Sequence, residues 1–186
     1  MRRRGFLAAG AGAITAGLAG CTVLGDDADL RRHSMSNDPG RTDLVYTHQD
    51  ERMLVISVRD RPPIGGDLTT VRLLIEQHAD TYLEDVRIRL LPTLEPTTHL
   101  EYLLKVPSES AFKSIDAVRD GDSFDLSLSD DEDDRGITKV VDVGLTASYD
   151  DLNGPLEISH ESVLAEPGMT GDTYTVEDTT DLEFGT

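Results

Sequence analysis

The stretch SFDLSLSD, residues 123–130, alternates apolar and polar side chains along its length. In an extended chain Phe124, Leu126 and Leu128 point to one side, and the Asp and Ser residues between them point to the other. This period of two predicts a β-strand with one buried face and one face in water, as in an antiparallel sheet. We therefore expect a fold built from strands.

Similar stretches occur on both sides of this one. The expected strands cover residues 53–60, 70–78, 85–92 and 99–107 before it, and 137–149, 155–163 and 173–178 after it. Gly, Pro, Asn and Asp, the residues that favour turns, separate them. Only SESAFKSIDAV, residues 108–118, is interpreted differently, as a short helical turn or as a segment that bridges two sheets.

These strands predict one all-β domain over residues 44–165, a single antiparallel β-sandwich of about seven or eight strands. Residues 166–186 are acidic and rich in Thr and Gly, and we expect a tail with one candidate edge strand. Residues 21–43 are polar, with Gly and Pro and no sustained period, which predicts a flexible tether. The one cysteine, Cys21, excludes an intramolecular disulfide.

The first 20 residues have the layout of an export signal. Three arginines at positions 2–4 precede an apolar stretch from Phe6 to Ala19, and small residues lead to Cys21. The apolar stretch has 14 residues, fewer than the ~18–20 that a membrane-crossing helix needs. We therefore expect a cleaved signal, with a retained membrane-spanning helix as the alternative.

Two motifs in this segment resemble those of exported lipoproteins. RRGFL, residues 3–7, resembles the twin-arginine export motif, and LAGC, residues 18–21, resembles a lipobox. The matching positions are Arg3, Arg4, Phe6 and Leu7 in the first motif, and Leu18, Ala19 and Gly20 before the cysteine in the second. The resemblance implies that the chain is cut before Cys21, whose sulfur then carries lipid on the extracytoplasmic face of the cell membrane. An ordinary free thiol at Cys21 is the alternative.

The chain is strongly acidic. Without residues 1–20 it has 14 basic against 36 acidic residues, a net charge of −22. In the full sequence Asp outnumbers Glu by 24 to 12, and Arg outnumbers Lys by 14 to 3. This bias resembles the proteins of extremely salt-loving archaea, in which molar salt screens the self-repulsion of the surface. Because the basic residues are scattered among acids, nucleic acid is not an expected partner.

The stretch from Val71 to Leu128 resembles immunoglobulin-like and adhesion-type sandwich modules. The residues that carry the resemblance are TVRLLIEQHADTYLEDVRIRLLP, from Thr70, and VRDGDSFDLSLS, from Val118. In such modules an apolar strand, a polar turn and further strands recur in this order. The sequence has no Trp and one Cys, so it lacks the Cys, Trp and Cys hallmark of antibody domains. The resemblance therefore implies an architecture rather than membership.

The acidic run from Ser129 to Asp142 holds the candidate metal ligands. On the calcium-loop template, Asp131 takes the first position, Asp133 the third and Asp142 the last. Arg135 stands where an oxygen ligand belongs, and the last position has Asp in place of Glu. A solvated hairpin turn is the favoured interpretation, and a calcium site is the alternative.

No other pattern indicates a metal or catalytic site. Blue copper needs a cysteine with two histidines, but Cys21 belongs to the lipobox. The five histidines form no H-x-H or H-E-x-x-H pair. Ser159 precedes His160, but neighbours along a strand point to opposite faces, and no G-x-S-x-G motif is present. We therefore expect no catalytic residue, metal or cofactor.

These observations predict a membrane-anchored extracytoplasmic lipoprotein with a non-catalytic β-sandwich, which serves in binding or in envelope organisation. The lipid on Cys21 is its expected contact with the membrane, and an envelope protein or polymer is its expected further partner. The alternative is an accessory or solute-binding component of a membrane transporter or enzyme complex. Such receptors usually have two α/β lobes and a longer chain.

Overall fold

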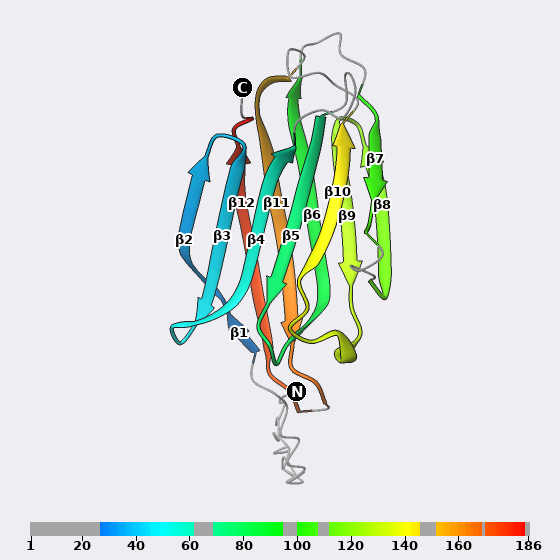
Figure 1. Cartoon of the computed structure of the whole chain (residues 1–186). Helices are drawn as coiled ribbons and strands as arrows, with labels where there is room; N and C mark the ends of the chain where they lie inside the picture. Colours follow the sequence, from blue (N-terminus) through cyan, green and yellow to red (C-terminus); the bar gives the residue numbers. More distant parts are fainter. Residues whose placement is uncertain are drawn as a thin grey trace, which may run out of the picture.

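The computed structural model describes residues 27–61, 69–94, 100–107, 112–145, 152–168 and 170–184. In these residues the chain forms twelve strands and one short 3-10 helix, η2 (Glu132–Asp134). The strands make two sheets that lie face to face as the layers of a sandwich (Figure 1). The expected export and lipidation residues lie outside the described residues; they are Arg3, Arg4, Phe6, Leu7, Leu18, Ala19, Gly20 and Cys21.

Sheet A has the strand order β1-β12-β11-β6-β9-β8. The bounds, in that order, are Asp27–Asp29, Thr173–Leu182, Leu152–Ala165, Tyr82–Leu94, Ser123–Ser129 and Ser114–Asp120. Strands β1 and β12 run parallel, and the other neighbours in this sheet are antiparallel.

Sheet B has the strand order β2-β3-β4-β5-β10-β7. The bounds, in that order, are Arg31–Asp38, Arg41–His48, Glu51–Arg61, Thr69–Gln77, Lys139–Leu145 and Tyr102–Lys105. All neighbouring strands in this sheet are antiparallel.

The core lies between the sheets and follows the predicted alternation. Leu126 and Leu128 of β9 are 1% exposed and stand opposite Ile88 and Val86 of β6. In β5 every second residue is buried and the residues between are partly exposed. Burying one aliphatic side chain contributes roughly 1.5–3 kcal/mol, so the apolar layer holds the two sheets together. The expected all-β sandwich is confirmed, and the described residues form twelve strands where about seven or eight were expected.

Each strand expected from the sequence overlaps an observed strand. The candidate edge strand in the acidic tail corresponds to β12, but β12 lies between β1 and β11 rather than at an edge. β1, which is far from β12 in the sequence, pairs in parallel with Thr173, Tyr174 and Thr175 on the side of β12 that faces away from β11. The C-terminal segment is therefore an inner part of sheet A.

The expected tether over residues 21–43 differs from the structure. Its described part contains β1, β2 and the start of β3. Asp38 stands opposite Arg41, and Pro39 and Gly40 form the two-residue turn between them, with a φ of +77° at Gly40. Every residue of β2 is exposed, so the strand has no apolar face. It is held by backbone pairing with β3 and by contacts of Arg32 and Met35 with β12. Such a strand shows no alternation of apolar and polar residues in the sequence.

The interpretation of residues 108–118 as a helical turn is wrong for its described part, since residues 114–120 form β8. This strand is also exposed along its whole length and pairs on one side with β9 across a turn at Gly121, where φ is +62°. The preceding strand, β7, belongs to sheet B. The segment between β7 and β8 therefore crosses from one sheet to the other, as the second interpretation expected.

Candidate functional site

A hollow of ≈ 440 Å³ lies on sheet A, across strands β6, β9, β11 and β12. Short side chains at Ser127 in β9, Ser159 in β11 and Thr179 in β12 stand among longer ones. The longer side chains that line it are Arg87, Arg89, Asp125, Glu161 and Glu177. A solvated face with short residues among long ones leaves room for a ligand, and this is the candidate site.

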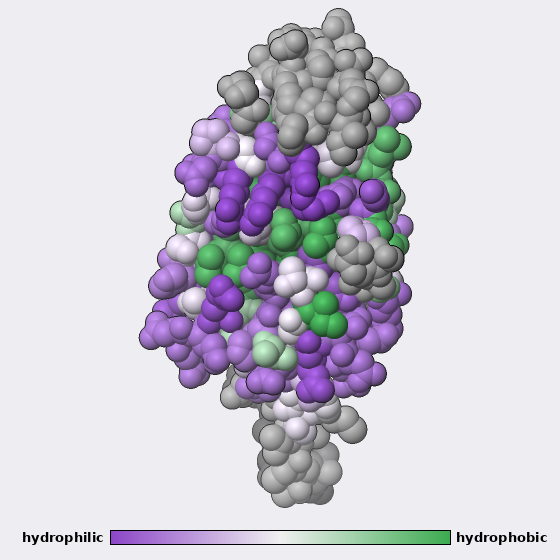
Figure 2. Space-filling model, in the orientation of Figure 1, coloured by the Kyte–Doolittle hydropathy of each residue, from purple (hydrophilic) through white to green (hydrophobic). Residues whose placement is uncertain are grey.

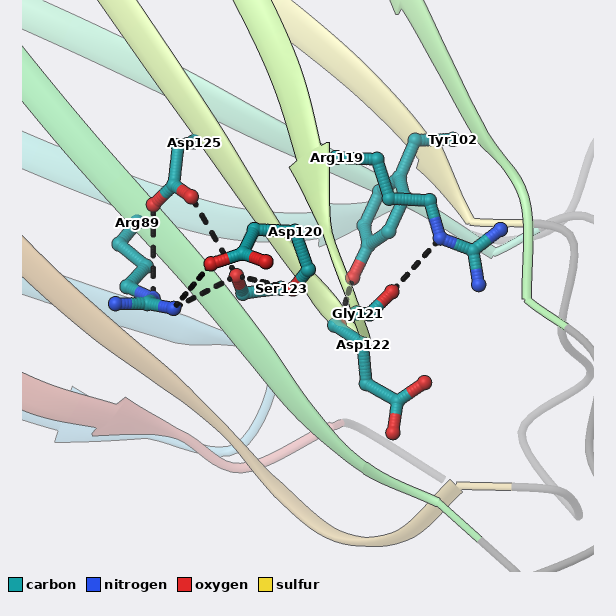
Figure 3. A network of polar contacts seen from close by, with 8 residues as sticks. All are labelled: Arg89, Tyr102, Arg119, Asp120, Gly121, Asp122, Ser123 and Asp125. Carbon is teal, nitrogen blue, oxygen red and sulfur yellow. Dashed lines mark hydrogen bonds and ion pairs between the residues drawn. The ribbon is translucent and has the colours of Figure 1, made fainter.

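Ion pairs fix the two arginines of the hollow. Arg87 lies 2.8 Å from Asp85 and 3.5 Å from Glu161. Arg89 donates a hydrogen bond of 2.9 Å to Ser123 Oγ and lies 3.5 Å from Asp125 and 3.8 Å from Asp120 (Figure 3). These groups are exposed, so each pair contributes little to stability, at most about 1 kcal/mol. Their effect is to hold both guanidinium groups in place across the hollow.

The turn between β8 and β9 supports Arg89 from the other side (Figure 3). Arg119 donates to the Gly121 carbonyl at 2.8 Å, and Tyr102 donates its hydroxyl to the Asp122 carbonyl at 2.6 Å. Tyr102 comes from β7 of sheet B and stacks on Phe124 of sheet A, with 4.7 Å between ring centroids. Burial raises the pKa of Tyr102, so the phenol stays a donor. The turn is thereby fastened to both sheets.

A buried polar chain crosses between the sheets near the hollow. Tyr46 donates its hydroxyl to Asp178 Oδ2 at 2.8 Å, so its oxygen accepts from His160 Nε2, 2.7 Å away. The other ring nitrogen, Nδ1, then accepts from Ser162 Oγ at 3.2 Å. Arg32 pairs with Asp178 at 3.2 Å. We call Tyr46, His160, Ser162 and Asp178 the His160 relay.

The His160 relay joins a serine, a histidine and an acid, but its surroundings do not suit catalysis. Ser162 and Tyr46 are 0% exposed and His160 is 3% exposed, so a substrate has no access to the serine. Burial lowers the pKa of His160 to about 4, which keeps the ring neutral. The relay therefore serves as a fully hydrogen-bonded link between β3, β11 and β12.

The prediction that the side chains of Ser159 and His160 point to opposite faces of the sheet is confirmed. Ser159 lines the hollow on the outer face, whereas the His160 side chain is buried toward Tyr46. The serine that contacts His160 is Ser162, two residues further along β11 and on the same face. The only sequence signal for this contact was the spacing of two residues, which puts both side chains on the same face of a strand. Tyr46 and Asp178 had no local signal.

The candidate calcium ligands lie in separate interactions. Asp131 pairs with Lys113 at 2.6 Å, and Asp142 receives two hydrogen bonds from Arg72, at 2.6 and 2.7 Å. Asp133 is exposed within η2. Within the described ranges no group of three or more His, Cys, Asp or Glu side chains is placed to hold a metal ion. The structure therefore does not bring the template positions together.

The residue just before the candidate calcium loop is the more informative one. Asp130 has a fully buried side chain, and its Oδ1 lies 3.0 Å from Nζ of Lys139, which is 2% exposed. Asp134 lies 3.3 Å from the same Nζ, and the Phe112 ring centroid lies 5.2 Å from it. Burial raises the pKa of Asp130, and Lys139 opposes that rise. We call these four residues the Lys139 cluster.

The histidines that the structure describes are dispersed. His48 packs edge-on against Tyr174, His78 pairs with Glu51 at 3.0 Å, and His160 belongs to the relay. His33 lies on the exposed strand β2. His99 lies outside the described residues. In the part of the chain that is described, no helix is long and apolar enough to span a bilayer.

The fold and the hollow define a class of protein, a β-sandwich whose open, polar sheet face forms its candidate site. The chain belongs to the family described as a domain of unknown function (DUF8121), which matches residues 30–186. The matched range takes in β2 and β12, which lie outside the expected 44–165 domain. A comparison with curated proteins found no match.

Among solved structures, the chain is similar to the collagen-binding subdomain of the Enterococcus faecalis surface protein ACE, at 14% identity and a TM-score of 0.40, over 67% of this chain and 92% of that one. It is also similar to a non-cellulosomal cohesin from the archaeon Archaeoglobus fulgidus, at 14% identity and a TM-score of 0.38. That similarity covers 60% of this chain and 80% of the cohesin chain.

A collagen-binding domain from a Staphylococcus aureus adhesin has 13% identity and a TM-score of 0.31, over 60% of this chain and 87% of that one. Similarities this weak do not extend to binding partners.

Proposed function

We propose that this chain is a lipid-anchored extracytoplasmic lipoprotein whose β-sandwich binds an envelope protein or polymer without catalysis. The observation that supports binding is the hollow on sheet A, where arginines and carboxylates are held by ion pairs on a solvated face. The serine and histidine that contact each other are buried beneath that face, so the exposed groups offer recognition and no activated nucleophile.

The anchor follows from the export and lipobox motifs, with lipid on the Cys21 sulfur. Asp27, the first residue of β1, is six residues after Cys21. A fully extended chain spans at most ~3.6 Å per residue, so the linker reaches no further than about 20 Å. The sandwich would therefore stand close to the membrane, with both sheet faces open beside it. The acidic surface suits an organism that lives in molar salt.

The anchor is tested by Cys21→Ser in the native host. The variant should leave the membrane fraction, whereas the unaltered protein should stay in it and show a lipid adduct on an N-terminal Cys21 by mass spectrometry. Retention of the variant in the membrane fraction contradicts the anchor.

Binding through the hollow is tested by filling it with Ser159→Trp. Ser34→Trp, on the exposed strand β2, is the matched control. Each full-length protein is used to retain envelope proteins and polymers in molar salt, and the retained species are quantified. A partner that binds the hollow should be kept by the control and lost by the Ser159 variant. Identical sets of partners for both variants contradict binding at the hollow.

A further inference from the structure

Exposed apolar side chains gather along one edge of the sandwich. Seven large apolar side chains are exposed in the described part of the chain, and four of them belong to β7 and β8. They are Leu103, Leu104, Ile115 and Val118. These strands end sheet B and sheet A on the same side of the molecule (Figure 1), and Figure 2 shows apolar residues along that side. An exposed apolar patch of this kind marks a contact surface, which we call the β7–β8 edge.

Strand β8 also has a free backbone edge. It is the last strand of sheet A and pairs with β9 in a regular antiparallel ladder. A two-residue turn joins the two strands, which makes Asp120 and Ser123 a hydrogen-bonded pair. Because the direction of hydrogen bonding alternates along a strand, Ile115, Ala117 and Arg119 point their N–H and C=O groups away from β9. These groups can pair with a further strand.

The amide of Ala117 agrees with this alternation. Its N–H donates to a side-chain oxygen of Asp116 at 3.0 Å, and all seven residues of β8 are exposed. Proteins commonly protect unpaired edges against unwanted strand addition, and Asp116 covers one donor here. An incoming strand would replace this hydrogen bond with a backbone one and release the carboxylate to a basic side chain.

The two faces of β8 differ in chemistry. Ile115 and Ala117 stand opposite buried leucines of β9 and therefore point toward the inner side of the sheet. Asp116, Val118 and Asp120 alternate with them and point outward. A strand added to β8 would therefore be stabilised by apolar side chains on its inner face and by basic side chains on its outer face.

Strand β7 continues the apolar inner side into sheet B. Leu104 stands opposite Val143, which is fully buried, so the Leu104 side chain also points toward the interior. Nevertheless Leu104 is 37% exposed and Ile115 is 39% exposed. The opening between the two sheets is therefore apolar and incompletely covered, and the inner side chains of an added strand would cover it.

The charges at this edge favour a basic partner over a second copy of the chain. The outer side of β8 and β9 carries Asp116, Asp120 and Asp125, and Arg89 of β6 pairs with the last two. Residues that stand opposite each other in an antiparallel pair share a face, so two β8 strands would place their acids on the same side. The net charge of −19 on each chain adds to that repulsion. A lysine or arginine opposite Asp116 would replace it with attraction.

We propose that the β7–β8 edge binds an extended segment of a partner protein, which adds to sheet A as an antiparallel strand beside β8. Its backbone pairs with the free groups of Ile115, Ala117 and Arg119. Its apolar side chains cover Ile115 and Leu104, and its basic side chains lie opposite Asp116. A helix cannot supply the backbone pairing, because its N–H and C=O groups are bonded within the helix. Among the described residues, none of β7 or β8 lines the hollow, so the inference goes beyond the proposed function.

The probes are two fluorescently labelled peptides of about nine residues, long enough to span β8, in which valine and lysine alternate. One is methylated on the backbone nitrogens of its lysines and the other on those of its valines, so composition and charge are identical. Residues paired across antiparallel strands share a face, so the valines that pack inward also direct their backbone groups toward β8. Methylation of the valines therefore removes the donors needed for pairing, and methylation of the lysines leaves them.

Binding to the full-length protein is measured by fluorescence anisotropy in molar salt. The lysine-methylated peptide should bind at least about tenfold more tightly than the valine-methylated one, because only the second loses hydrogen bonds to β8. Ala117→Pro should weaken the tighter binding, since it removes a donor of the free edge at a position where edge strands tolerate proline.

Leu104→Gln should weaken binding of the lysine-methylated peptide at least about fivefold through lost apolar contact. Leu91→Gln is the matched control, because Leu91 in β6 is also 37% exposed, and it should leave the affinity unchanged. The hollow variant Ser159→Trp should leave it unchanged as well. Circular dichroism and urea unfolding check that each variant folds.

Four results would overturn the proposal. They are valine methylation that weakens binding no more than lysine methylation, equal effects of Leu104→Gln and Leu91→Gln, loss of binding in Ser159→Trp alone, and a dimer that Ala117→Pro converts to a monomer in sedimentation experiments. The third result would place the peptide in the hollow, and the fourth would mean that a second copy of the chain occupies the edge.

Discussion

Two buried polar clusters join the sheets, and they do so by different physical means. In the His160 relay the ring is neutral, and the hydroxyl of Tyr46 and both ring nitrogens are hydrogen-bonded. In the Lys139 cluster an ammonium group faces the buried Asp130 at ion-pair distance, but neither carboxylate oxygen of Asp130 has a well-aligned hydrogen bond. Charge holds the second cluster, and directed hydrogen bonds hold the first.

The difference shows how each cluster should fail. A buried charge that loses its partner is strongly destabilising, because desolvation is no longer compensated. A buried hydrogen-bonding group that loses its partner costs less, roughly 1–3 kcal/mol. The Lys139 cluster should therefore be the more sensitive to substitution, and the His160 relay the more sensitive to mild acid.

The largest effect is expected from Lys139→Ala. It leaves Asp130 buried without a counter-charge, which should lower the free energy of unfolding by about 3–5 kcal/mol. Urea unfolding in molar salt measures the loss. Lys113→Ala is the matched control, because Lys113 and Asp131 form a similar pair with side chains 59% and 56% exposed.

The control should lose little stability, because solvent screens an ion pair between exposed side chains. Replacing both partners, as Asp130→Leu with Lys139→Met, should restore most of the stability, since an apolar pair needs no desolvation. If Lys139→Ala costs as little as Lys113→Ala, the cluster is not held by charge.

The next effect is a pH dependence from His160. Its pKa falls from 6.5 to about 4 on folding because the ring is buried. Between these values the unfolded chain binds the proton and the folded chain does not, so stability falls as the pH drops from about 6.5 to about 4, by about 3 kcal/mol in total. Asp130, whose pKa burial raises above its ordinary value of 3.8, contributes with the opposite sign, because between 3.8 and the raised value the folded chain binds the proton and the unfolded chain does not.

Unfolding free energies at pH 7 and pH 4.5 isolate this contribution. His160→Leu should be less stable at pH 7 and should lose most of the slope. His78→Gln, which removes a histidine paired with an exposed glutamate, should keep it. A slope that survives in His160→Leu would assign the pH dependence to other groups.

The smallest effect distinguishes the two sides of the relay. Tyr46→Phe removes the hydroxyl that joins His160 to Asp178 and leaves a buried donor unpaired, at a cost of about 1–3 kcal/mol. Ser162→Ala leaves only the acceptor nitrogen of His160 without a partner and should cost about 1 kcal/mol. Denaturant midpoints of the two variants give the comparison. A larger loss for Ser162→Ala would mean that the hydrogen bond within β11 contributes more to stability than the hydrogen bonds of Tyr46 between the sheets.

Strand positions could be predicted where a strand has one buried face. The alternation in β9 and β5 was visible and is confirmed. Strands β2 and β8 lie at sheet edges with every residue exposed, so composition gave no period to follow. Each of these strands pairs with a single neighbour, and that neighbour is set by the fold.

The candidate sites were less predictable than the strands. Tyr46 is 114 residues from His160, and Asp178 is 132 residues from Tyr46, so no local pattern connects them. Arg41, Arg59 and Arg72 stand opposite one another in β3, β4 and β5, and this alignment depends on register. A slip of one residue would turn Arg59 or Arg72 toward the core.

The sequence by itself determined the charge of the chain, the motifs around Cys21 as expectations, and which strands have an apolar face. These are properties of residues that are close in the sequence. In an extended chain successive side chains point to opposite sides, so a local pattern is enough to predict a strand with one apolar face. Only the tertiary structure decided that β12 is an inner strand and that His160 meets Tyr46. Each of these depends on which distant strands pair and in which register, and burial of the whole core, rather than any short segment, selects that pairing.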